Sequence, residues 1–313
     1  MTGSSDNYTA IHFPNSTDGY ISTESEYAIM TINGGTTWEE VTTKFIDDFQ
    51  CVWFANESTG WMAGDYGAII KTTDGGATWT DQSITSTHPY FEACSFLSAT
   101  TGFLSADDGE IWKTTDGGDN WTKFVIGKNY INAIWAFDTN NLVAGNSSGR
   151  LYRTADGGEN VTDFTTDIIP ANIMLYDIIC FDENSLVMGG SNEGSIFRSS
   201  DGGNTWNSVP KVIYRTILDI VRLDGTTVLA CSEVGLIIKT TDKGANWTKK
   251  TSGSNSYLYA LSCPDGNTVY ACGQSGTILK SSDGGENWTK QTSGTTNTLY
   301  GISFWDANNG IAV

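Results

Sequence analysis

Residues 72–79 read TTDGGATW, and this octapeptide decides the fold because variants of it recur along the chain. The carboxylate of Asp74 can accept backbone N–H bonds across a turn, and Gly75 and Gly76 supply backbone angles that a Cβ resists. Trp79 is a large ring that two packed sheets can bury. The octapeptide therefore predicts a tight turn held by Asp74, followed by a strand that projects Trp79 between neighbouring sheets.

The octapeptide occurs seven times at nearly constant spacing. Its copies end at residues 38, 79, 121, 161, 206, 247 and 288, so the spacings are 41, 42, 40, 45, 41 and 41 residues. Around the second copy, the segments FQCVWF, NEST, GWMAG and DYGAIIK indicate a strand, a turn and two further strands. A repeat of about 40 residues with four strands, A to D, is typical of a propeller blade.

We therefore predict an all-β fold, a β-propeller of four-stranded antiparallel blades, with seven blades favoured and eight as the alternative. The end of the chain, LYGISFWDANNGIAV, repeats strands A and B alone. A single domain is expected over residues 1–313. Its blades are predicted at about 8–43, 48–84, 90–125, 130–165, 174–209, 216–251 and 257–292, with a half blade at 298–313.

The repeats resemble the BNR/Asp-box superfamily. The wider unit, LYGISFWDANNGIAV at 299–313 together with GTILKSSDGGENW at 276–288, is similar to the photosystem II stability and assembly factor family. Members of that family are extracytoplasmic seven-bladed propellers that act as assembly chaperones without catalysis. The resemblance therefore implies an extracytoplasmic or extracellular, secreted protein and a protein partner.

The Asp-box positions are predicted to be structural. Asn33 replaces the acidic residue in the first copy, Val161 replaces tryptophan in the fourth and Lys243 replaces the first glycine in the sixth. The predicted structural residues are Asn33, Asp74, Asp116, Asp156, Asp201, Asp242, Asp283, Trp38, Trp79, Trp121, Trp206, Trp247 and Trp288.

The family resemblance also carries over a basic residue just before the box. It implies a ring of positive charge, although lysine is less suited than arginine to bidentate recognition of a carboxylate. Ion pairs with the surrounding acidic residues are the alternative interpretation. The basic residues are Lys71, Lys113, Arg153, Arg198, Lys239 and Lys280, with Met30 in the first repeat.

Composition limits the classes of partner. The 36 acidic residues against 17 basic ones give a formal charge of −19, which repels phosphate backbones, so nucleic acid is not expected. No stretch approaches the roughly 18 apolar residues of a membrane span, and the N-terminal MTGSSDNYTA lacks the features of a signal peptide. Six cysteines are spread singly without a CxxC pair, so no metal or cofactor is predicted.

The B–C loops and D–A linkers supply the candidate binding face, because they combine rings with hydrogen-bonding groups suited to a protein or a glycan. We expect this face to hold the partner. Its candidate residues are Asp65, Tyr66, Asp107, Asp108, Asn146, Asn192, Glu193, Glu233 and Gln274.

The sequence favours a non-catalytic binding or assembly scaffold over two alternatives. One is a surface or virion adhesin that recognises glycans or receptors. The other is a glycoside hydrolase of the Asp-box type. An inverting enzyme would need two carboxylates about 6.5–9.5 Å apart, and the acidic residues of the B–C loops are the candidates. A sialidase needs three convergent arginines, whereas the five arginines here come from three consecutive repeats. We therefore assign no catalytic residue.

Overall fold

The computed structural model describes residues 8–23, 27–41, 48–164, 175–182, 184–191 and 195–313. The chain divides into two compact units, Met1–Leu142 with Thr154–Val161, and Val143–Arg153 with Thr162–Val313. Blades 1 to 3 belong to the first unit and blades 5 to 7 to the second, and the strands of blade 4 are divided between them.

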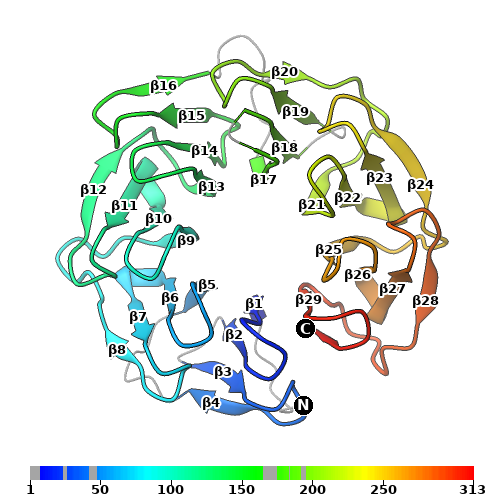
Figure 1. Ribbon diagram of the computed structural model, residues 1–313, viewed down its shortest axis with the longest axis horizontal. Helices are drawn as coiled ribbons and strands as arrows, with labels where there is room; N and C mark the ends of the chain where they lie inside the picture. Colours follow the sequence, from blue (N-terminus) through cyan, green and yellow to red (C-terminus); the bar gives the residue numbers. More distant parts are fainter. Residues whose placement is uncertain (1–7, 24–26, 42–47, 165–174, 183, 192–194) are drawn as a thin grey trace. The chain divides into compact units, whose positions relative to one another are not determined.

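Within the described residues, seven four-stranded antiparallel sheets and one two-stranded hairpin form, and in each sheet the strands lie in sequence order (Figure 1). This confirms the predicted β-propeller fold with seven four-stranded blades. The extent of the single domain stays a prediction.

The first three blades contain β1 (Tyr8–His12), β2 (Gly19–Thr23), β3 (Ala28–Thr31) and β4 (Glu39–Val41); β5 (Phe49–Phe54), β6 (Gly60–Gly64), β7 (Ile69–Thr72) and β8 (Thr80–Asp81); β9 (Phe91–Phe96), β10 (Gly102–Ala106), β11 (Glu110–Thr114) and β12 (Thr122–Val125). Blade 4 contains β13 (Ile131–Ala136), β14 (Leu142–Asn146), β15 (Leu151–Thr154) and β16 (Val161–Asp163).

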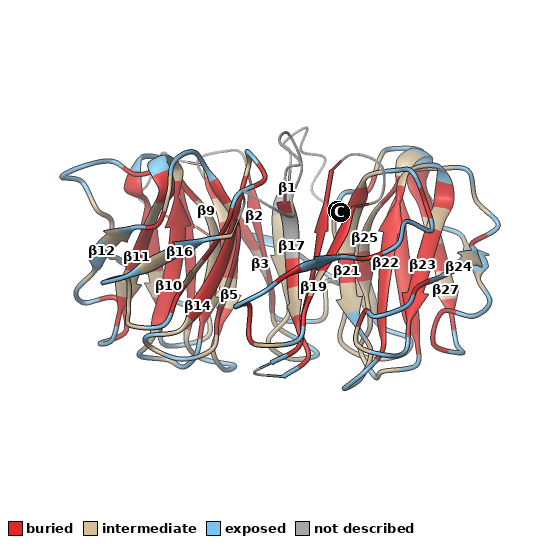
Figure 2. Ribbon diagram, turned by 90° about the horizontal axis from the view of Figure 1, so that it is seen from above, coloured by how far each residue is buried: buried red, intermediate tan, exposed pale blue. Residues whose placement is uncertain are grey.

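The remaining blades contain β17 (Leu175–Cys180), β18 (Leu186–Gly190), β19 (Ile196–Ser199) and β20 (Asn207–Ser208); β21 (Ile217–Arg222), β22 (Val228–Ser232), β23 (Leu236–Thr240) and β24 (Thr248–Thr251); β25 (Leu258–Ser262), β26 (Val269–Gly273), β27 (Thr277–Ser281) and β28 (Thr289–Gln291). The terminal hairpin pairs β29 (Ile302–Phe304) with β30 (Gly310–Ala312). Figure 2 shows that buried residues gather on the second and third strands, such as β22 and β23, whereas turns and outer strands are exposed.

Interleaved aromatic rings pack neighbouring blades together. The ring of Tyr20 in blade 1 stacks on Phe54 of blade 2 at 4.1 Å between centroids, and Trp79 meets Phe54 edge-on at 6.2 Å. In the next pair of blades, Trp61 stacks on Phe96 at 4.2 Å. Such offset and edge-to-face pairs add to the free energy gained by burying the rings. The box tryptophans thus complete an aromatic layer between adjacent sheets.

The Asp-box turn is closed by a repeated set of hydrogen bonds. In blade 2, Oδ1 of Asp74 accepts the backbone N–H of Thr78 at 2.9 Å and the hydroxyl of Thr72 at 2.8 Å, and Oδ2 accepts the Thr78 hydroxyl at 2.6 Å. These bonds lower the pKa of Asp74. Asn33 of blade 1 accepts the equivalent N–H, from Thr37, at 2.9 Å. The hydroxyl at the first position of the box and the Thr or Asn before its last residue were not singled out from the sequence.

The second box glycine is required by close packing. Gly76 has a φ of 81°, and a Cβ there would lie 2.5 Å from the ring of Tyr20 in the preceding blade. Gly75 is anchored differently, since its N–H donates to the carbonyl of Ser58 in the A–B turn at 2.9 Å. The box therefore connects its own hairpin to the preceding blade and to the A–B turn of its own blade.

Side chains on inner strands also bond to the next blade. The hydroxyl oxygen of Ser95 accepts the N–H of Ala136, and Oδ2 of Asp219 accepts the N–H of Leu261 at 2.7 Å. Burial raises the pKa of Asp219 to about 7. Near neutral pH this carboxyl group is therefore partly protonated, and it still satisfies a backbone donor that would otherwise lie buried without a partner.

His12 makes the first unit sensitive to acid. Its ring stacks on Phe54 at 5.9 Å and lies 5.7 Å from Trp53, and burial lowers its pKa from 6.5 to about 4. Between these values the unfolded chain binds a proton that the folded chain does not, so folding stability falls as the pH falls from 6.5 toward 4. We expect this to cost about 3 kcal/mol of folding stability at pH 4, and His12→Phe to remove the loss. Urea unfolding of both proteins across this pH range checks the expectation, and parallel pH profiles would contradict it.

Candidate functional site

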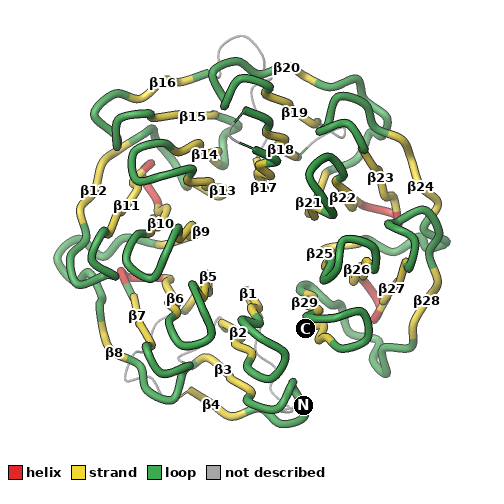
Figure 3. Tube along the Cα trace, viewed as in Figure 1, coloured by secondary structure: helices red, strands yellow, loops and turns green. Residues whose placement is uncertain are grey.

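Four B–C loops form short 3-10 turns that project their middle residue. They are η1 (Asp65–Gly67), η2 (Asp107–Gly109), η3 (Glu233–Gly235) and η4 (Gln274–Gly276), drawn red in Figure 3. The middle residues are in the left-handed region, with φ of 53° at Tyr66, 52° at Asp108, 50° at Val234 and 55° at Ser275. This conformation is energetically unfavourable for a residue other than glycine. Such backbone strain is concentrated at functional sites.

Three of these loops, η1, η2 and η4, are held at both ends. In blade 2, the N–H of Asp65 donates to the carbonyl of Asp48 at 2.8 Å, and the N–H of Gly67 donates to the carbonyl of Pro89 at 2.6 Å. In blade 3, Gly109 donates in the same way to Asn129 at 2.9 Å. The loop is thus fixed both to the start of its own strand A and to the linker into the next blade. The side chains that it carries are preorganised for contact with a partner.

In the first unit the candidate binding face centres on two tyrosines. The rings of Tyr66 and Tyr90 lie 4.9 Å apart, and 53% of Tyr66 is exposed. A hydrogen bond between the two hydroxyls, together with desolvation and nearby negative charge, raises the pKa of Tyr90 to about 12. The Tyr90 hydroxyl therefore remains neutral over the physiological pH range.

Carboxylates surround this tyrosine pair. Oδ1 of Asp107 accepts the N–H of Tyr90 at 3.0 Å, and Oδ1 of Asp65 accepts the Gln50 amide at 3.5 Å. Burial raises the pKa of Glu92, and the charges of Asp65 and Asp107 raise it further. Asp108, the middle residue of η2, is exposed. This part of the face thus combines exposed rings with negative charge.

In the second unit a row of three tyrosines lies beside η4. The ring of Tyr259 is 6.3 Å from Tyr257 and 5.0 Å from Tyr300, and 60% of Tyr300 is exposed. Gln274 donates its amide to the Tyr259 hydroxyl at 3.4 Å. In η3, Glu233 lies 3.8 Å from the guanidinium of Arg215. The second unit therefore carries rings and both signs of charge.

Not every predicted residue belongs to this surface. Asn146 is fully buried, and its Oδ1 accepts the N–H groups of Ser148 at 3.0 Å and Arg150 at 2.8 Å. It therefore shapes its own loop and offers nothing to a partner, which corrects the prediction that it contacts one. Asn192 and Glu193 lie outside the described residues.

Glu92, Tyr259 and Tyr300 were not predicted from the sequence. The first two occupy a β-bulge near the start of strand A, where the register shifts between β9 and β10 and between β25 and β26. Gln50 occupies the same bulge in blade 2. A bulge re-aims the side chain of its extra residue and is common beside functional sites. In each of these blades the bulge residue directly follows the first buried residue of strand A. This position could be recognised from the sequence only by aligning the repeats.

The basic residues before the box point to the next blade. Nζ of Lys71 donates to the carbonyl of Gly117 at 2.7 Å, and Nε of Arg198 donates to the carbonyl of Lys243 at 2.9 Å. Both acceptors belong to the following Asp box. A ligand that needed these cations would have to break contacts between blades.

The other basic residues have comparable contacts. Arg153 reaches the Asn204 side chain at 2.8 Å, Lys280 reaches the carbonyl of Ala307 at 2.8 Å, and Lys113 lies 6.0 Å over the Phe103 ring. Lys239 pairs with Glu286 at 2.8 Å, the one ion pair that these six residues form with a described carboxylate. The six side chains thus mainly connect blades.

Two further features bear on function. Among the described residues, no three His, Cys, Asp or Glu side chains gather in a way that could hold a metal ion. Nor does any helix in the described part of the chain have the length and hydropathy to span a bilayer.

The fold and the repeat agree with comparisons to known proteins. The sequence profile of the photosynthesis system II assembly factor YCF48 matches residues 3–126 and 40–169, which together exceed half of the chain. The chain belongs to this family. No curated protein sequence matches it.

Solved structures of YCF48 share its fold. The structure described as YCF48 bound to D1 peptide has a TM-score of 0.66 at 20% identity, covering 84% of this chain and 87% of its own. YCF48 from Cyanidioschyzon merolae has a TM-score of 0.64 at 20% identity, covering 83% and 90%. The computationally designed Ika8 protein has a TM-score of 0.80 at 14% identity, covering 100% and 94%. These likenesses establish the fold alone.

Proposed function

We propose that this YCF48-family protein is a non-catalytic assembly scaffold that binds a protein partner through its B–C loops, in an extracytoplasmic compartment. The observation that carries the proposal is the exposure of tyrosines on rigid loops and linkers. Tyr66, Tyr130, Tyr214 and Tyr300 are between 45% and 71% exposed, and each lies in a B–C loop or beside the start of a strand A. Tyrosine is enriched in protein interfaces because it joins a large apolar area to a hydroxyl group.

The carboxylates of the loops support binding over catalysis. Asp107 uses one oxygen to hold the Tyr90 backbone, and Glu233 lies against Arg215, so both contribute to loop structure or local charge. A YCF48 structure described as bound to D1 peptide supports a polypeptide as the partner in this family. The negative charge around Tyr66 and Tyr90 favours a partner segment that carries basic residues.

Photo-crosslinking tests the proposal. A photoreactive phenylalanine analogue is placed at Tyr66 or at Tyr300, and a matched control carries it at Ala77, an exposed residue of an Asp-box turn. We expect one and the same protein to be captured from positions 66 and 300 but not from position 77. Capture from position 77 alone would place the binding surface at the box turns and overturn the proposal.

A further inference from the structure

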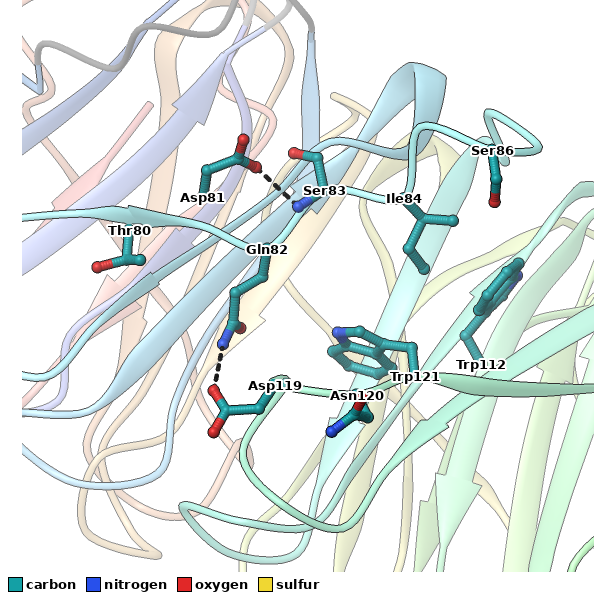
Figure 4. A pocket seen from close by; sticks show the side chains of 11 residues that line it. Thr80, Asp81, Gln82, Ser83, Ile84, Ser86, Trp112, Asp119, Asn120 and Trp121 are labelled. Atoms are coloured by element: carbon teal, nitrogen blue, oxygen red, sulfur yellow. Dashed lines mark hydrogen bonds between the residues drawn. The ribbon is translucent and has the colours of Figure 1, made fainter.

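A groove lies on the outer edge of the first unit and ends at the linker after β8, where the N–H of Ile84 donates to the carbonyl of Gly67 in η1 at 2.8 Å. It has a volume of about 550 Å³ and runs between β8, the outermost strand of blade 2, and the Asp-box turn of blade 3. Figure 4 shows the side chains that line it, including Gln82 and Asp119 on one side and Trp112 and Trp121 on the other. Its size is in the range of small-molecule sites.

Two indole rings form the apolar part of the groove. Trp121 is fixed by an edge-on contact with Phe96 at 6.5 Å. Trp112 is held by its Nε1 bond to Glu110 at 2.9 Å, and Nζ of Lys123 lies 5.3 Å over its ring. Trp112 is buried, whereas Trp121 is partly exposed. The Trp121 ring, held in this way, offers an apolar surface without further loss of side-chain entropy on binding.

Polar atoms without a partner lie in the same groove. Oε1 of Gln82 and Nε1 of Trp121 are buried, and neither forms a hydrogen bond. In contrast, Trp206, Trp247 and Trp288 donate their Nε1 to the carbonyl of their own box glycine at 3.1 Å. Trp79 also lacks a partner, but it does not line this groove. An acceptor and a donor among the lining residues thus remain unsatisfied, which is costly unless a bound molecule engages them.

The remaining groups define the chemistry of the ligand. Nε2 of Gln82 lies 3.2 Å from the carbonyl of Gly117 and 3.4 Å from Oδ1 of Asp119, while the other oxygen of Asp119 accepts no hydrogen bond from the described residues. Two carboxylates, Asp81 and Asp119, disfavour phosphate or carboxylate groups, as does the net charge of −19. Strand addition is disfavoured because β8 has only two residues.

We propose that this groove between blades 2 and 3 binds a neutral saccharide. One face of a sugar ring is apolar and fits against an indole, and its hydroxyl groups both donate and accept hydrogen bonds. Asp119 accepts hydroxyl protons, and the Gln82 amide and the Trp121 N–H bond to ring substituents after a small movement of the Gln82 side chain. None of the candidate binding-face residues lines this groove, so the two proposals can be tested separately.

Calorimetric titration with neutral cello-, xylo-, manno- and malto-oligosaccharides at millimolar concentration tests the site. We expect at least one series to bind, and Asp119→Ala and Gln82→Ala each to weaken binding by about tenfold. Glu159→Ala is the matched control, because it alters the same box position in blade 4 and should leave the affinity unchanged. Circular dichroism melting curves show whether each variant is folded.

Three results would overturn the proposal: no binding of any neutral oligosaccharide, equal binding by the wild type and Asp119→Ala, or binding of a lysine-containing peptide in place of a sugar. The cross-linking experiment on the B–C loops is unaffected by any of them. Failure of this site and failure of the proposed scaffold function are therefore distinguishable.

Discussion

Replacing Trp206 by alanine is expected to lower the free energy of unfolding by about 3–5 kcal/mol. Its side chain is 1% exposed, and its Nε1 donates to the carbonyl of Gly203 at 3.1 Å. Truncation removes the buried ring, leaves a cavity and deprives that carbonyl of its partner. Denaturant unfolding followed by circular dichroism measures the loss.

Trp38→Ala is the matched control for this substitution. Trp38 holds the same box position in blade 1, but its side chain is only partly buried and meets Phe13 edge-on at 6.2 Å. We expect the control to cost clearly less than Trp206→Ala, because less apolar area is lost. Equal losses for both variants, or a loss below about 1 kcal/mol for Trp206→Ala, would contradict the structural role of the box tryptophan.

The fold could be predicted from the repeat, because one octapeptide contains both the residues that form a local turn and the residue that makes a long-range contact. Asp74 closes the turn through Thr78, and Trp79 contacts Phe54 of its own blade and Tyr20 of the preceding blade. Each blade repeats both signals, so a single sequence contains several independent examples of the same structure. Their agreement predicted the four-stranded blade from pattern alone.

The candidate site was less predictable, because loop geometry decides which side chains reach solvent. Asn146 has the composition of a binding residue, yet its amide oxygen turns inward to two backbone donors. Glu92 and Tyr259 lie within strands, and only the bulge at their position re-aims them. The role of Lys71 could not be read from its spacing either, because its acceptor lies 46 residues along the chain, in the next blade.

The second large effect is expected at the candidate binding face. The quadruple variant Tyr66→Asn, Asp108→Asn, Glu233→Gln and Tyr300→Ala removes two exposed rings and two charges. Asparagine is used at positions 66 and 108 because it tolerates the left-handed backbone found there. Interface tyrosines commonly contribute 2 kcal/mol or more to affinity, so we expect binding of the captured partner to weaken by about 100-fold or more.

The dissociation constant of this variant for the protein captured by cross-linking is the most direct test of the account. The control variant Thr73→Ala, Glu159→Gln and Thr241→Ala alters exposed residues in or beside Asp-box turns and should bind as the wild type does. The account predicts a loss of about 100-fold for the quadruple variant with unchanged thermal stability, and none for the control. Wild-type affinity in the quadruple variant, or an equal loss in the control, would contradict binding through the B–C loops.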